Sequence, residues 1–258
     1  MHGAALFLRA GPDGYEMRRA GDPYGLIHTV PQVMAWNVQL AVQRLEHIAR
    51  WTQILTLASP NNLIPSDAVR IILSRVSAAG KEEPVDTTGV VRLEYELRDG
   101  KWRPPAFRIN LTNTSSLTLF CMLFDLTEGK AVQPLLGRGV WLEPGQEIAV
   151  GEGRPLIAHL PDDLWELGIT QVRDTIKLIV STGESDANLL AQEDLPMRPN
   201  RETAYQGPRR TNNTLERLMR RVITRSVARR GGGEEAIVYW NSAEVTTLTV
   251  RLRPDNEL

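Results

Sequence analysis

Eight short segments between residues 69 and 182 constrain the fold more than any other feature of the chain. Each is an apolar or alternating run, and each is bounded by Gly, Pro, Asn, Asp or Ser. Regular runs with such boundaries predict an antiparallel β-sandwich of immunoglobulin-like style. In chain order, the runs are VRIILSR, VVRLEYEL, FRINLTN, LTLFCMLFDL, AVQPLL, QEIAV, PLIAHL and DTIKLIVST.

The connections between these runs contain turn signals. Asp99-Gly100 predicts a two-residue hairpin, because a type I′ turn requires positive φ at both central residues. Pro144-Gly145 predicts a type II turn with glycine at its third position. Pro104-Pro105 predicts an edge or a bulge, since proline cannot donate to a ladder. The segment LPDDLWELG predicts a helical turn capped by Asp162.

The first part of the chain has a different periodicity. Residues 4–9 and Tyr15–Met17 predict two short strands joined by the turn AGPDG. From Pro31 to about Leu57 the pattern predicts an amphipathic helix with Pro31 near its first turn. Its apolar positions are Met34, Val38, Ala41, Leu45, Ile48 and Leu55. His47 lies away from this apolar face, so we expect it to be solvated or at an interface.

The last part of the chain predicts a linker, a helix and two strands. Residues 196–213 are rich in proline and predict an exposed linker. Residues 214–230 predict a basic amphipathic helix, and two strands around Asn241-Ser242 predict a closing hairpin. The apolar face of this helix carries Leu215, Leu218, Met219, Val222, Ile223 and Ser226, and the opposite face carries Arg217, Arg220, Arg221 and Arg225.

These elements together predict an α+β chain that is mainly β. Residues 1–66 are expected to form a β-hairpin and an amphipathic helix, and residues 67–195 a β-sandwich. Residues 196–213 are the linker, and residues 214–258 hold the basic helix and the closing hairpin. The two helices are expected to brace the sandwich.

The basic helix belongs to a charge asymmetry along the chain. Residues 143–194 contain eleven acidic residues against three basic ones, whereas residues 201–230 contain nine arginines against two glutamates. Three interpretations are open: the helix docks on the acidic body of the same molecule, binds an acidic protein, or binds the phosphates of nucleic acid or membrane. No aromatic residue is interleaved with the arginines, which disfavours nucleic acid. Residues 214–230 still leave a nucleic-acid sensor as an alternative function.

Cys121, the only cysteine, decides between a hydrolase and a non-catalytic chain. Apolar residues on both faces of LTLFCMLFDL predict a central strand with a buried thiol. No charged residue lies within three positions of Cys121 on either side, so nothing nearby in the sequence would stabilise a thiolate. We therefore expect no catalytic residue. The alternative is a free-standing cysteine hydrolase that uses Cys121 with His159 or His47. His159 itself is expected to pack on a strand.

Cysteine and histidine usage also bears on cofactors and on the cellular setting. The four histidines form no HxxxH or HxH pair and there is no CxxC, so neither a metal nor a cofactor is predicted. A single cysteine excludes an internal disulfide and favours a reducing, cytoplasmic setting. The N-terminal residues contain no signal-peptide apolar stretch, and no apolar run is long enough to span a bilayer. We expect no membrane partner.

Five stretches together resemble the C-terminal accessory region of bacterial caspase-like, metacaspase-related cysteine peptidases. The similarity covers roughly residues 33–253 and contains no catalytic motif. The stretches are LEHIARWTQILTLASPNN, VRLEYELRDGKWRPPAFRINLTNTSSLTLFCMLFDLTE, VWLEPGQEIAV, DTIKLIVSTGESDANLL and YWNSAEVTTLTVRLRP.

The resemblance implies a non-catalytic regulatory or target-recognition module in a stress or antiviral defence pathway. Peptidases of this family, which are cysteine-type endopeptidases, carry a His-Cys dyad in an N-terminal α/β domain. Neither His2-Gly3 nor Cys121 has the flanking residues of that dyad. Bacterial relatives cut after basic residues, so Arg209 and Arg210 are the expected processing site. The expected partner is the caspase-like peptidase domain or its protein target.

Overall fold

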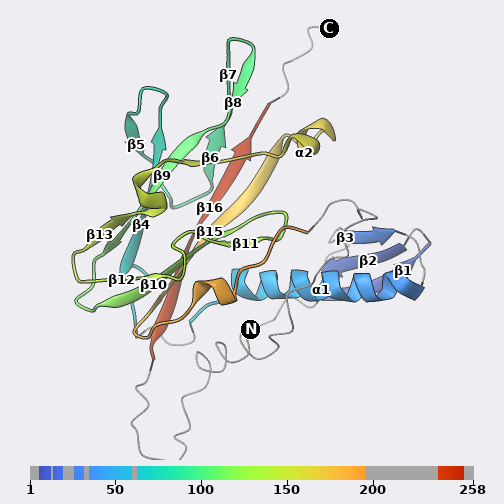
Figure 1. Ribbon diagram of the computed structural model, residues 1–258, viewed down its shortest axis with the longest axis horizontal. Helices are drawn as coiled ribbons and strands as arrows, with labels where there is room; N and C mark the ends of the chain where they lie inside the picture. Colours follow the sequence, from blue (N-terminus) through green and yellow to red (C-terminus); the bar gives the residue numbers. More distant parts are fainter. Residues whose placement is uncertain are drawn as a thin grey trace, which may run out of the picture.

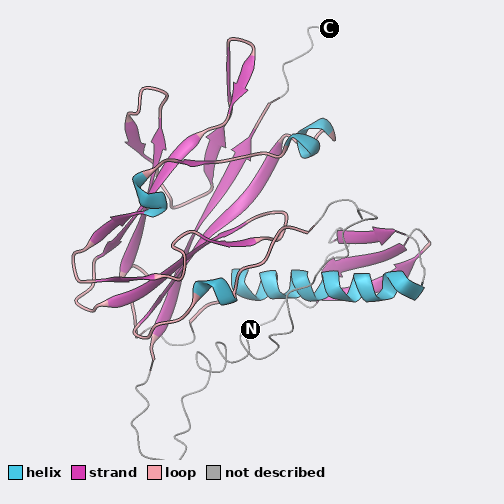
Figure 2. Ribbon diagram, viewed as in Figure 1, coloured by secondary structure: helices cyan, strands magenta, loops and turns pink. Residues whose placement is uncertain are grey.

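Antiparallel β-sheets dominate the fold (Figures 1 and 2). The computed structural model describes residues 6–12, 14–19, 26–31, 35–59, 63–195 and 238–252. Within these residues the chain is mainly β with few helices, as the sequence predicts. The predicted boundaries at residues 66, 195 and 213 stay predictions.

Six of the described strands form the larger sheet. They are β6 (Val91–Glu94), β10 (Leu119–Leu126), β11 (Val132–Pro134), β12 (Val140–Leu142), β15 (Gln171–Ser181) and β16 (Trp240–Val250). Their order is β11-β10-β15-β16-β6, with β12 also pairing with β10. β15 and β16 pair antiparallel along all 11 residues of each, and β6 runs parallel to β16. β16, the last of the described strands along the chain, therefore lies inside the sheet (red in Figure 1).

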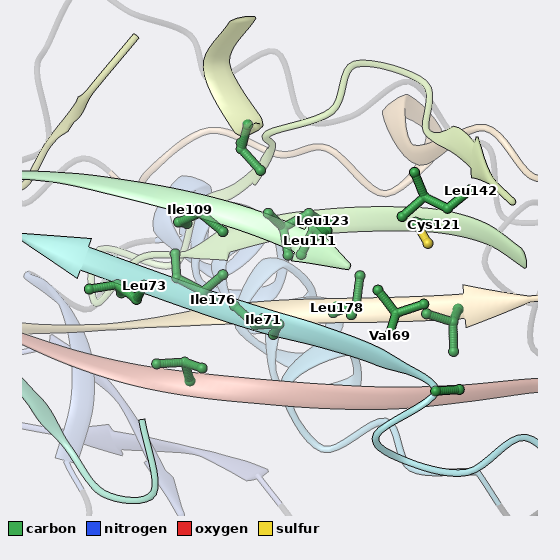
Figure 3. Packing of buried hydrophobic residues seen from close by; sticks show 14 of the residues in the cluster. Val69, Ile71, Leu73, Ile109, Leu111, Cys121, Leu123, Leu142, Ile176 and Leu178 are labelled. Atoms are coloured by element: carbon green, nitrogen blue, oxygen red, sulfur yellow. The ribbon is translucent and has the colours of Figure 1, made fainter. Parts of the chain in front are cut away.

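A second sheet packs against the larger one in a sandwich-like arrangement. Its strands are β4 (Val69–Val76), β5 (Glu82–Pro84), β9 (Ala106–Asn113), β13 (Glu147–Ala149) and β14 (Leu156–Ile157). Every second residue of β9 is buried, as expected for a strand with one face on a core. Ile71 and Leu111 from this sheet share one buried cluster with Cys121 and Leu178 from the larger sheet (Figure 3).

Helix α1 (Ala35–Leu55) covers the outer face of the larger sheet. Trp51 and Ile54 share a second buried cluster with Phe120, Met122 and Phe124 of β10. This explains why β10 is apolar on both faces: one face packs on the second sheet and the other on the helix. The prediction of a central, doubly buried strand is confirmed.

A small third sheet packs on α1. Its strands are β1 (Leu6–Gly11), β2 (Gly14–Arg19) and β3 (Leu26–Pro31), joined in sequence order. Met17 and Val30 of this sheet form a third buried cluster with Ala41 and Ile48 of α1. The predicted hairpin of β1 and β2 is confirmed, whereas β3 was not predicted.

Several expectations for the first helix are wrong. Pro31 lies in β3 rather than in the first turn, and α1 begins at Ala35. His47 is 2% exposed instead of solvated, while Val38 of the expected apolar face is 41% exposed. The reason is that α1 contacts the small sheet as well as the larger one, so a single apolar stripe does not describe its buried surface.

The strand and turn signals between residues 69 and 182 are largely confirmed. Each of the eight predicted runs contains a strand. Asp99 and Gly100 have φ of 51° and 70° and connect β7 (Glu96–Arg98) to β8 (Lys101–Arg103). Gly145 has φ of 76°, and the Gln146 N–H donates to the Glu143 carbonyl at 3.0 Å. The run VVRLEYEL is interrupted at Tyr95, between β6 and β7.

Two predicted local structures are corrected. Asp162 does not cap α2 (Asp162–Glu166), because Pro161 occupies the N-cap position and no side chain caps the helix. The turn at Asn241-Ser242 does not form, since both residues lie within β16. The side-chain donors of Asn241 and Ser242 bond to the carbonyls of Ile64 and Leu57, outside the strand.

Side chains of β15 and β16 donate hydrogen bonds to carbonyls at the end of α1 and in the segment that follows it. Lys177 Nζ donates to the Leu55 carbonyl at 2.7 Å, and Ser242 Oγ donates to the Leu57 carbonyl at 3.0 Å. Asn241 Nδ2 donates to the carbonyl of Ile64. A cation at the last carbonyls of a helix complements the helix dipole. These bonds fix the helix against β15 and β16.

Candidate interaction site

The predicted interaction and processing residues lie outside the described residues. These are Arg217, Arg220, Arg221 and Arg225 of the expected basic helix, and Arg209 and Arg210 of the expected linker. The roles of these arginines stay predictions.

Cys121 is sealed in the core, as predicted. The residue is 0% exposed, and its Sγ lies 3.8 Å from the Leu119 carbonyl, to which it donates. Figure 3 shows the sulfur among apolar side chains that include Leu142. Burial raises the pKa of the Cys121 thiol to about 12. A thiol in such surroundings is neutral and inert.

The histidines of the alternative hydrolase do not reach this thiol. His47 Nε2 lies 3.0 Å from the Lys130 carbonyl, and burial lowers the pKa of the His47 ring. His159, expected to pack on a strand, is exposed beyond the end of β14, where its Nδ1 lies 3.3 Å from Tyr95 Oη. The described residues therefore contain no Cys121–His pair.

A cluster of three aromatic rings around Arg251 stands out at one end of the larger sheet. The guanidinium carbon of Arg251 lies 4.2 Å from the ring centroid of Trp165, 5.5 Å from that of Tyr95 and 6.0 Å from that of Trp102. These distances permit cation–π attraction. A guanidinium nitrogen also donates to the carboxylate of Asp162. We call these five residues the Arg251 site.

Four separate elements bring the Arg251 site together. Arg251 follows β16, Tyr95 lies between β6 and β7, Trp102 is in β8, and Trp165 is in α2. Backbone hydrogen bonds fix them: the Tyr95 N–H donates to the Val250 carbonyl, and the Arg251 N–H donates to the Thr170 carbonyl, both at 2.8 Å. The geometry is therefore set by the end of the sheet.

Three exposed leucines lie near residues of the Arg251 site in the sequence or in the strand pairing. Leu97 is 52% exposed and lies opposite Trp102 in the β7–β8 hairpin, and Leu252, which follows Arg251, is 56% exposed. Leu167, at the end of α2, is 57% exposed. All three lie at the end of the molecule that holds β7, β8 and α2 (Figure 1). Apolar side chains next to aromatic rings and arginine are typical of protein interaction surfaces.

The opposite end of the sheets provides a comparison. Leu117, in the connection between β9 and β10, is 46% exposed there, and Trp141 is also exposed. Trp141 packs on Phe120 with ring centroids 5.2 Å apart. Leu117 is exposed to a similar degree as the leucines near Arg251 but lies at the other end of the sheets, so it is a suitable control for them.

The sequence reasoning missed the Arg251 site. The local signals were Trp102 next to the Asp99-Gly100 turn and Trp165 in the short helix, each an aromatic residue beside a predicted surface turn. Nothing in the linear sequence connects them with Arg251, because their meeting depends on where β16 enters the sheet.

Two half-buried carboxylates, Asp125 and Asp174, form a second electrostatic feature near the ends of β10 and β15. Burial, with Asp174 and Asp194 nearby, raises the pKa of Asp125 to about 7. Burial likewise raises the pKa of Asp174 to about 6, although its Oδ1 accepts the Glu128 N–H at 2.9 Å. No group of three or more His, Cys, Asp or Glu in the described part of the chain is arranged to hold a metal ion.

Comparisons with known proteins give no family assignment. A scan against protein-family models and a search of curated proteins both found no match to the chain. Within the described ranges, no helix is long and apolar enough to cross a membrane.

Proposed function

We propose that this chain is a non-catalytic, regulatory or target-recognition module that binds the catalytic domain of a bacterial caspase-like peptidase or the protein target of that domain. The observation that carries the proposal is the Arg251 site with its exposed leucines. The sequence resemblance to the accessory regions of these peptidases supports the choice of partner.

The Arg251 site suits protein binding for three physical reasons. Its rings and guanidinium are already held in place, so little side-chain entropy is lost on binding. Leu97, Leu167 and Leu252 offer apolar area that a partner can remove from water. Arginine and tryptophan are also the residues that dominate the binding energy of protein interfaces.

The absence of catalysis in this proposal rests on Cys121. A thiol with a pKa of about 12 and no histidine partner among the described residues is a poor nucleophile. The buried sulfur therefore favours a binding role over the alternative cysteine hydrolase.

The finer description of the fold belongs to the same proposal. We regard the two sheets that share the Cys121 core as an immunoglobulin-like sandwich, braced by α1 and by the predicted basic helix. The shared core, and the packing of Trp51 and Ile54 on the outer face of β10, support this description.

The proposal includes processing in the cytoplasm. Cleavage after Arg209 or Arg210 by the parent peptidase is the regulatory event, within a stress or antiviral defence pathway. Incubation of the chain with that peptidase, followed by mass spectrometry, is expected to give a cut between residues 198 and 230. A chain that remains intact there removes the processing step from the proposal.

Binding is tested by titrating the full chain against the caspase-like catalytic domain encoded in the same genome, using calorimetry. The Leu97→Asp variant changes an exposed residue of the site, and Leu117→Asp is its control with similar exposure at the opposite end. We expect saturable binding that Leu97→Asp weakens at least about tenfold. Loss of one buried leucine contact accounts for a change of that size, and Leu117→Asp should bind like the parent.

If the parent chain does not bind the catalytic domain, that domain is excluded as the partner and only its protein target is left in the proposal. If Leu117→Asp weakens binding as much as Leu97→Asp, the Arg251 site is not the binding surface. Binding to anionic polymer that falls steeply with salt, without binding to the peptidase domain, would instead favour the nucleic-acid alternative.

A further inference from the structure

β16 lies between β15 and β6 in the larger sheet, and it is the strand that connects them. β16 pairs with β15 on one edge and with β6 on the other, so it fills the space between strands that precede it in the sequence. The chain from 196 to 237 separates β16 from the rest of the described residues. The larger sheet is therefore complete only when Trp240–Val250, from the C-terminal part of the chain, lies between β15 and β6.

Side chains on both faces of β16 take part in the core. Val245 is 4% exposed and belongs to the cluster between the two sheets, whereas Trp240 is 5% exposed and belongs to the cluster under α1. Val250, Thr247 and Thr249 are also buried. Burial of these side chains on both faces favours binding of the strand, because it removes apolar surface from water.

Polar contacts fix the register of β16 near its N-terminal end. Asn241 bonds to the Ile64 carbonyl and Ser242 to the Leu57 carbonyl, as described above. The Tyr239 N–H donates to Thr182 Oγ1 at 3.0 Å, and the Thr182 N–H donates to the Tyr239 carbonyl at 2.9 Å. A shift by one residue would exchange the two faces of the strand and break these bonds.

The other end of β16 is fixed by the Arg251 site. The Arg251 side chain lies among three rings, and the Val250 carbonyl accepts from Tyr95. Both ends of the strand and both of its edges are therefore held by non-covalent contacts between described residues. None of these contacts involves residues 196–237.

We propose that residues 238–252 act as a strand ligand of the rest of the described fold, adding between β15 and β6 and held there without any need for a covalent connection through residues 196–237. The ligand class is an extended peptide that pairs with β15 on one edge and with β6 on the other by β-augmentation. Specificity comes from an Asn-Ser pair at one end, an arginine at the other and buried apolar residues between them. A chain cut between 195 and 238 then remains one assembly.

This inference does not depend on the proposed partner or on natural processing. It is tested in the full chain by replacing residues 209–212 with the recognition sequence of a sequence-specific protease and cutting the folded protein. We expect both fragments to elute together in size-exclusion chromatography, and the circular dichroism spectrum to match that of the uncut chain. A C-terminal fragment that elutes alone in native buffer would overturn the inference.

The specificity of this strand binding is tested on the cut protein with a pair of variants. Asn241→Ala removes the bond to the Ile64 carbonyl, and Thr246→Ala changes a half-buried residue of the same strand. Dilution followed by chromatography measures the dissociation constant of the two fragments. We expect Asn241→Ala to raise this constant at least about fivefold relative to Thr246→Ala, the factor for one buried hydrogen bond of about 1 kcal/mol. Equal constants for the two variants would contradict the assigned register.

Discussion

Alkylation of Cys121 tests whether the thiol is sealed in the native chain. The perturbation is iodoacetamide at pH 8, and the chain offers a single cysteine to react. Burial raises the pKa of this thiol from 9.0 to about 12. The thiolate fraction at pH 8 then falls from about one-tenth to about one part in ten thousand, so the native rate should be about a thousandfold lower than that of an exposed thiol.

Steric exclusion lowers the rate further. Because Cys121 is 0% exposed, the reagent reaches the sulfur only after the sheets open. Reaction then proceeds through a rarely populated open state, as amide exchange does in cores. In the open state the thiol has its ordinary pKa, so the opening equilibrium sets the protection for that route, and the factor of a thousand applies to reaction in the closed state.

The assay follows intact mass over time in native buffer and in concentrated urea. We expect rapid modification in urea and slow modification in native buffer, with a native rate that rises as urea approaches the unfolding midpoint. A native rate within about tenfold of the unfolded rate would refute the reasoning, because an accessible thiolate near neutral pH is the property of an activated cysteine.

Three further predictions follow from described contacts. Lys177→Met removes the bond to the Leu55 carbonyl and should lower the free energy of unfolding by about 1–3 kcal/mol in urea denaturation, whereas unchanged stability would contradict the role of Lys177 as a clamp on α1. Arg251→Met should lower it by about 1–2 kcal/mol through lost cation–π contacts, and should red-shift tryptophan fluorescence; an unchanged spectrum would argue against the ring cluster. Because the pKa of Asp125 is raised to about 7 in the folded chain, the proton on this carboxyl stabilises the fold at low pH, and the contribution is lost as pH rises from about 4 through about 7. Asp125→Asn should therefore be more stable than the parent at pH 8 by up to a few kcal/mol and should gain less at pH 5; an equal gain at both values would contradict the raised pKa.

The strands between residues 69 and 182 could be predicted because their signals are local. Alternation along β9 follows from one buried face, and two apolar faces along β10 follow from cover on both sides. The β7–β8 turn is fixed by two residues, Asp99 and Gly100. These patterns depend on neighbours in the sequence, so they need no knowledge of sheet order.

The remaining features depend on contacts between distant residues. His47 has a polar side chain on a helix, and its burial follows from packing of the Lys130 region on α1. Asn241 and Ser242 are turn-forming residues that here bond to the segment after α1. The Arg251 site requires β16 to lie beside β6. Sheet order is set by the sum of packing terms across the molecule, which no window of sequence contains.

The most direct measurement of the central claim is hydrolysis of an arginyl peptide substrate by the chain alone and by the caspase-like catalytic domain with and without the chain. We predict that the chain alone shows no turnover that depends on Cys121. We also predict that the chain changes kcat or KM of the catalytic domain. The Leu97→Asp variant should lose this effect, and the Leu117→Asp variant should keep it. Turnover by the chain alone that is lost in Cys121→Ala would contradict the account.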